Sequence, residues 1–162
     1  MPEVVADTSP LQYLHCLGLL DLLRQWYGTV SVPMAVLHEI EVGAAQGANV
    51  PSIRGLPWIR VEAVSDAATG RVMTSLGRGE RESIGLALTK LQPLLILDDR
   101  TARCEAQRLS LRCTGTAGVL IRAKREAIVG QLAPLLDDLR QHGFYLDAKT
   151  RAHMLRLAGE TC

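Results

Sequence analysis

Hydrophobic and polar positions in this 162-residue chain fall into two alternating patterns. Short apolar runs that end at acidic residues, Gly or Pro predict buried β-strands, whereas apolar positions three or four apart predict amphipathic helices. The predicted strands are 4–7, 29–33, 93–99 and 111–115, together with 58–64, whose alternating pattern favours a sheet edge.

Helices are predicted between these strands and after the last of them. Thr8-Ser9-Pro10 is a helix-start signal, a hydroxyl cap followed by proline, and the leucines of 11–23 form one apolar stripe behind it. Pro33 opens a second helix that runs to about Ala44. The remaining predicted helices are 80–91, 100–109, 116–129, 134–144 and 147–160, and the Gly- and Pro-rich segment 43–57 is predicted to be a loop.

This alternation predicts an α/β fold with a central, mostly parallel sheet. The length predicts one domain, residues 1–162, with the C-terminal helices at about 134–160 packing on its core. In such sheets the ligand crevice lies beyond the carboxyl ends of the strands. Candidate functional residues are therefore expected at those ends.

Composition and charge narrow the classes of function. The net charge of +1 provides no global basic field for nucleic acid. The basic residues are mostly Arg, which suits phosphate contacts but also follows from biased genomic composition. Scattered Cys and His residues argue against a zinc site or a disulfide framework. Without a signal-peptide pattern or a membrane-spanning apolar run, a cytoplasmic protein is expected.

Acidic residues stand at several predicted junctions between elements. Asp7 and the pair Asp98-Asp99 close two strands, while Glu39 and Glu80 lie on helices just behind Pro or Gly. If the fold brings them together, their charges oppose one another's ionisation, and a hard divalent cation with oxygen ligands removes the conflict. The pattern therefore predicts a metal-dependent enzyme acting on phosphodiesters.

Each acid also has a purely structural interpretation. Asp7 and Asp98-Asp99 are suited to capping the helices that follow, and an acid at Glu80 is favoured by the helix dipole. Glu39 alone fits a solvated helix residue, and Glu82, two residues from Glu80, faces elsewhere.

Five motifs in a fixed order carry a resemblance to a known family. They are DTSP at 7–10, VPMAVLHEI at 32–40, LGRGERESIGLA at 76–87, LLILDDRTAR at 94–103 and GTAGVLIRAK at 115–124. Together they resemble the PIN-domain nucleases, and more narrowly the prokaryotic predicted nucleic-acid-binding branch related to VapC-type toxins. The resemblance spans nearly the whole chain and implies a three-layer α/β/α PIN-like fold.

The resemblance also implies a function. It is that of a ribonuclease that needs Mg²⁺ or Mn²⁺ and hydrolyses RNA phosphodiester bonds by metal-activated water. A role as the toxin of a toxin–antitoxin pair would bring a small antitoxin protein as partner, and homodimerisation is expected. No residue pattern indicates either partner independently.

Residue by residue, the family's acids fall on Asp7, Glu39, Glu80 and Asp99, which are the expected catalytic residues. Asp98 is an added acid of this branch and joins these four in the expected metal-ligand set. Which of Asp98 and Asp99 touches metal stays open, and a shifted register would replace Glu80 by Glu82.

Several polar residues are candidates for substrate contacts. Ser9 and Thr116 are suited to hydrogen-bonding a ligand acid or a phosphate, with helix capping and turn formation as their alternatives. Arg100, Arg103 and Arg78 are suited to steering phosphate, or to pairing with neighbouring acids.

Two other classes of protein compete with the nuclease. A PIN-like chain that has lost catalysis would act as a nucleic-acid- or protein-binding module. A phosphoacceptor receiver domain also has acids at the carboxyl ends of parallel strands, but its acid pair follows the first strand. Here a single Asp7 comes first and the pair comes late, which disfavours the receiver.

Overall fold

Five short strands form the central sheet of the computed structural model, which describes residues 1–160. They are β1 (Val4–Ala6), β2 (Val30–Pro33), β3 (Ile59–Glu62), β4 (Leu94–Ile96) and β5 (Arg112–Thr114). Their spatial order is β3-β2-β1-β4-β5, and every neighbouring pair is parallel. The predicted α/β class is confirmed, as are the five strands and the edge position of the third.

Helices connect the strands and extend beyond the last one. They are α1 (Thr8–Cys16), α2 (Asp21–Tyr27), α3 (Met34–Ala45), α4 (Asp66–Thr69), α5 (Arg78–Leu88), α6 (Arg100–Arg108), α7 (Thr116–Arg125), α8 (Leu132–Gln141) and α9 (Ala148–Leu157). A single 3₁₀ turn, Ile53–Gly55, lies in the segment predicted to be a loop.

Two expectations about the first helix were wrong. The leucine stripe of 11–23 is divided between α1 and α2, because the chain leaves the helix after Cys16 and re-enters it at Asp21. Helix α1 begins at Thr8 with Asp7 at the N-cap position, so Ser9 lies inside the first turn and does not cap it. The four-residue helix α4 was not predicted.

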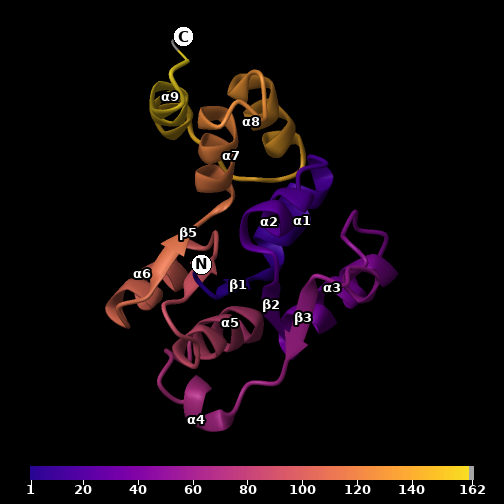
Figure 1. Cartoon of the computed structure of the whole chain (residues 1–162), viewed down its shortest axis with the longest axis vertical. Coiled ribbons are helices and arrows are strands. Elements are labelled where there is room, and N and C mark those ends of the chain that lie inside the picture. The colour runs from indigo at the N-terminus through magenta and orange to yellow at the C-terminus, as the bar shows by residue number, and fades with distance from the viewer. Residues whose placement is uncertain (161–162) are drawn as a thin grey trace.

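Alternating strand residues face two separate cores, which gives the fold three layers. Val4, Ala6 and Ile96 point to the face that is covered by α1, α7 and the C-terminal helices. Val5, Leu95 and Leu97 point to the opposite face and pack with residues of α5 and α6. In Figure 1, α8 and α9 lie at the end of the molecule opposite α4 and α5.

The chain changes direction within the sheet between β1 and β4. From β1 the chain runs outward through β2 to β3, and then returns to place β4 on the other side of β1. Such a switch point opens a crevice beyond the carboxyl ends of the two strands. The residues that follow β1 and β4 are Asp7 and the stretch Leu97-Asp98-Asp99.

The described residues also bear on two smaller expectations. Cys16, Cys104 and Cys113 are free thiols, and Cys162 lies outside the described residues. Within residues 1–160 no helix has the length and apolar character needed to cross a membrane.

Candidate active site

The crevice at the switch point gathers acids from four elements. Asp7 and Asp99 extend from the ends of β1 and β4, while Glu39 and Glu80 come from α3 and α5, which pack together. The negative charges of Glu39 and Glu80 contribute to raising the pKa of Asp7, and those of Asp99 and Glu39 contribute to raising the pKa of Glu80. The four predicted catalytic residues are therefore electrostatic neighbours.

Asp7 is the most buried member, with 5% of its surface exposed. Its backbone N–H donates to the Ile96 carbonyl at 3.0 Å, and Ser83 Oγ donates to its Oδ1 at 3.1 Å. Burial is the main cause that raises the pKa of Asp7 to about 7, and hydrogen bonds lower it only in part. Asp7 is thus a carboxyl group for which ionisation is costly near neutral pH.

Glu39 is fixed by groups from two other elements. Its carboxylate accepts hydrogen bonds from Thr8 Oγ1, in α1, and from the Gly79 N–H, in α5, the latter at 3.1 Å. A Cβ at position 79 would lie 2.5 Å from Glu39 Oε1, well inside contact distance. Only glycine leaves room for this approach, which explains the Gly before Glu80 in the GRGE segment.

Glu80 stands in the first turn of α5 and is half-buried. Its Oε2 accepts a 3.0 Å hydrogen bond from the Gly77 N–H, which completes a capping arrangement at the helix start. Burial is the largest cause of the raised pKa of Glu80, followed by the Gly77 bond, which lowers it, and by the charges of Asp99 and Glu39. Glu80 therefore both caps the start of α5 and belongs to the acidic cluster.

The two adjacent aspartates after β4 have different surroundings. Both Asp98 oxygens are taken up by Thr116, whose N–H and Oγ1 each donate at 2.7 Å. Burial raises the pKa of Asp98, and these bonds partly offset the rise. Asp99 is exposed, and its Oδ1 caps α6 by accepting from the Ala102 N–H at 2.8 Å. The structure thus favours Asp99 over Asp98 as the acid open to a ligand.

Glu82, the register alternative to Glu80, has partners of its own. Its Oε2 accepts from the Ala35 N–H at 3.0 Å, at the start of α3, and its Oε1 pairs with Arg78 Nε at 3.1 Å. Arg78 therefore pairs with an acid. These contacts give Glu82 a structural role in holding α5 against α3.

A cavity of about 460 Å³ opens beside the acids. Its lining includes Glu80, Asp98 and Asp99, together with Ser9 and Arg100. Of the predicted substrate-binding residues, Ser9 and Arg100 thus reach open space. Thr116 is fully buried on Asp98, and Arg103 is half-buried with Nη1 3.5 Å from the Leu97 carbonyl.

The chemistry of these side chains fits a hard divalent cation. Carboxylate oxygens are the ligands that Mg²⁺ and Mn²⁺ prefer, and a cation would offset the burial and the neighbouring charges that raise the pKa of Asp7 and Glu80. In residues 1–160, however, no three His, Cys, Asp or Glu side chains are arranged to hold one ion. The acids are instead turned toward internal donors, with which an ion would compete.

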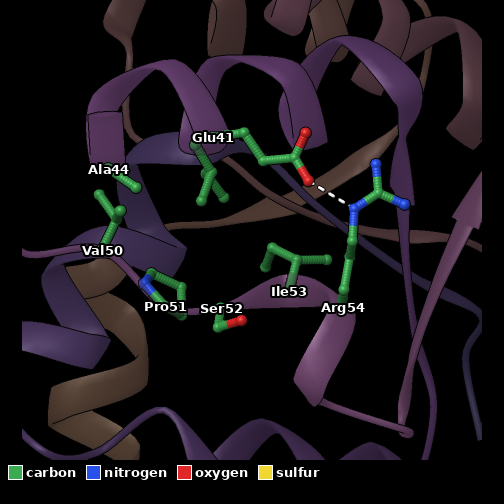
Figure 2. Close-up of a pocket in the computed structure, with 8 residues that line it drawn as sticks. Glu41, Ala44, Val50, Pro51, Ser52, Ile53 and Arg54 are labelled. Carbon is green, nitrogen blue, oxygen red and sulfur yellow. Dashed lines mark hydrogen bonds and ion pairs between the residues drawn. The ribbon is translucent and has the colours of Figure 1, made fainter. Parts of the chain in front are cut away.

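A second pocket lies away from these acids, between α3 and the segment 50–54. Figure 2 shows Glu41 and Arg54 joined across one side of it, by an ion pair of 2.5 Å, with Ala44, Val50 and Pro51 opposite. The side chains of Glu39 and Glu41 thus extend from the same helix to different partners, Glu39 to Thr8 and Gly79 and Glu41 to Arg54. Only Glu39 belongs to the acidic cluster.

Several residues that hold the acids in place were not predicted as site residues. Ser83 and Thr8 donate to the acids, and Gly79 both donates and makes room. Ser83 had the one available clue, since it is a polar residue on the buried face of α5, three positions after Glu80.

The fold is that of an α/β protein with a parallel sheet, and a cluster of carboxylates lies at the switch point of that sheet. This combination is typical of nuclease-like α/β proteins. A family model described as PIN domain matches residues 3–160, and the chain belongs to the PIN-domain family. PIN domains are generally nucleases, which supports hydrolase chemistry at this site. No curated protein matches the chain.

Proposed function

We propose that this protein is a ribonuclease that depends on Mg²⁺ or Mn²⁺ and acts as the toxin of a toxin–antitoxin pair. The observation that carries the nuclease proposal is the crowding of Asp7, Glu39, Glu80 and Asp99 at the switch point, where burial and the neighbouring negative charges raise the pKa of Asp7 and of Glu80. Such a cluster is costly by itself and favourable around a divalent cation.

In this proposal Asp7, Glu39, Glu80 and Asp99 hold the cation. When bound, the ion would neutralise charge on the phosphodiester and lower the pKa of an attacking water. The chain's own donors orient the acids: Ser83 holds Asp7, and Thr8 with Gly79 holds Glu39. Asp98 positions the start of α7 through Thr116, and Arg100 at the cavity wall is placed to attract phosphate.

The decisive experiment compares neighbouring acids in one assay of Mn²⁺-dependent RNA cleavage. Asp7→Asn, Glu80→Gln and Asp99→Asn are expected to lower the cleavage rate at least a hundredfold, since each removes a proposed ligand. Glu82→Gln is the matched control from the same helix and is expected to keep activity within a few-fold. Equal loss in Glu80→Gln and Glu82→Gln would refute the proposed ligand set.

The same assay distinguishes a nuclease from a protein that only binds RNA. If the purified wild-type protein binds RNA yet no divalent ion supports cleavage, the chain is a binding module that has kept the fold.

The toxin role rests on family likeness and needs a separate test. Induced expression is expected to arrest growth of a bacterial host, and Asp7→Asn to abolish the arrest. A short neighbouring reading frame whose product copurifies and restores growth would supply the antitoxin. Growth unaffected by the active wild-type enzyme would argue for a stand-alone nuclease.

The proposed homodimer is checked by sedimentation of the purified protein.

A further inference from the structure

The connection between α8 and α9 presents one aromatic ring to solvent. Tyr145 is 87% exposed, although both of its neighbours are anchored. The Phe144 ring packs edge-to-face on Tyr13 of α1, with 5.2 Å between ring centroids, and Leu146 is buried in the core. The exposed ring therefore stands on a fixed segment of chain.

The turn that precedes Tyr145 is closed by backbone hydrogen bonds. The N–H groups of Gly143 and Phe144 donate to the carbonyls of Arg140 and Leu139 at 3.1 and 3.0 Å. Gly143 has a φ of +94°, a conformation that glycine adopts without strain and other residues do not. The backbone that carries Tyr145 is thus held in place by the end of α8.

Tyr145 lines the same cavity as the acids. Tyr13, Phe144 and Tyr145 line the same 460 Å³ space as Glu80 and Asp99. A volume of this size is within the range of about 300–1,000 Å³ that is common for small-molecule and cofactor sites. The lining of the cavity therefore combines aromatic rings with two of the proposed catalytic acids.

We propose that Tyr145 stacks on an unpaired nucleobase of the RNA substrate and thereby positions the neighbouring phosphodiester at the acids. This inference deepens the proposed function and rests on it. The base is the uncharged part of a nucleotide, so it is the part that an acidic cavity accepts beside an aromatic wall. Arg100, on the same cavity, is placed to meet a phosphate of that strand.

The same geometry discriminates against paired RNA. A base inside a duplex is stacked on its neighbours and cannot offer its face to a side chain, so recognition by stacking requires unpaired nucleotides. The site would tolerate different bases, because every base has a flat aromatic face.

The test is binding of a fluorescein-labelled single-stranded RNA, followed by anisotropy with Ca²⁺ in place of Mg²⁺. Stacking contributes about 1–3 kcal/mol per base, so Tyr145→Ala is expected to weaken affinity roughly fivefold to a hundredfold. Tyr145→Phe keeps the ring and is expected to bind like the wild type. Leu91→Ala removes another exposed apolar side chain, 83% exposed and just before the amino end of β4, whereas the acids lie beyond the carboxyl ends of the strands, and it is expected to have no effect.

A second variant reports the stacking directly. Tyr145→Trp is expected to bind normally and to lose tryptophan fluorescence when RNA is added, whereas Leu91→Trp is expected not to. A duplex of the same sequence is expected to bind more weakly and to be indifferent to Tyr145→Ala.

The outcomes separate the two proposals. Wild-type protein that cleaves RNA while Tyr145→Ala binds as tightly as wild type would overturn the stacking site alone. Wild-type protein that neither binds nor cleaves RNA would overturn the proposed function and the stacking site with it. Equal weakening by Tyr145→Phe and Tyr145→Ala would show that the hydroxyl matters, which contradicts stacking.

Discussion

Removing the charge of Asp7 is expected to stabilise the metal-free protein above neutral pH. The pKa of Asp7 is raised from 3.8 to about 7, chiefly by burial, whereas the unfolded chain keeps the ordinary value. Between these two values the folded state binds a proton that the unfolded state has lost, so stability falls as pH rises from about 4 to about 7. At 1.36 kcal/mol for each pH unit between these two pKa values, the ionised Asp7 side chain lowers the free energy of unfolding by about 4 kcal/mol at pH 8.

Asp7→Asn should remove most of that cost while keeping an oxygen acceptor for Ser83. Urea unfolding in EDTA is expected to show the variant more stable than wild type by about 2–4 kcal/mol at pH 8, with the difference shrinking toward pH 4. Asp66→Asn, at an exposed position in α4, serves as the control and should show no comparable gain. A gain that is equal at pH 5 and pH 8, or a variant less stable at pH 8, would refute this account of Asp7.

Three further predictions concern the cation, the glycine of the site and a structural acid. Mn²⁺ at pH 8 is expected to raise the melting temperature of the wild type but not that of Asp7→Asn, measured by differential scanning fluorimetry, because ligand binding to the folded state stabilises it. Gly79→Ala is expected to lower RNA cleavage at least tenfold, because the new Cβ displaces the Glu39 carboxylate. Its thermal stability should be unchanged or higher, because alanine favours the helix. Gly130→Ala is the control: position 130 has open space around it, so cleavage should be unchanged. The pKa of Glu105 is lowered to about 2, mainly by its bonds to Arg108, so its carboxylate stabilises the fold above pH 4.5. Glu105→Gln should therefore lower the urea midpoint of unfolding at pH 7. The difference from wild type should disappear as pH falls toward 2.

Most of the fold was predictable, because short apolar runs and helix-start residues occur where the elements begin. The failures have local causes. Leu17, Leu19 and Leu20 continue the apolar spacing through the break between α1 and α2, so hydrophobic periodicity alone could not reveal that break. Helix α4 has four residues, Asp66–Thr69, which is too short for any periodic signal.

The acids of the candidate site could be predicted from the sequence, but the groups that donate hydrogen bonds to them could not. Asp7 and Asp98-Asp99 follow strands, so the rule for parallel sheets places them at one edge. Glu39 by itself favoured a solvated residue, because its bonds to Thr8 and Gly79 depend on how α3 packs against α1 and α5. Tyr145 has no sequence signal either: its exposure follows from the fixed turn at Gly143 and the docking of Phe144 on Tyr13.

Backbone N–H groups at helix starts account for how this many acids coexist in one crevice. Glu39 and Glu80 accept from Gly79 and Gly77 at the start of α5, and Asp99 accepts from Ala102 in α6. Helix N-termini favour negative charge, so these contacts stabilise carboxylates that would otherwise repel one another. Asp7 is deeper, and burial raises its pKa to about 7 even though the Thr8 backbone and the Ser83 hydroxyl, at 3.1 Å, lower it in part. Of these acids Asp7 therefore has the most to gain from a cation, which is why its substitution should both stabilise the metal-free protein and abolish stabilisation by Mn²⁺.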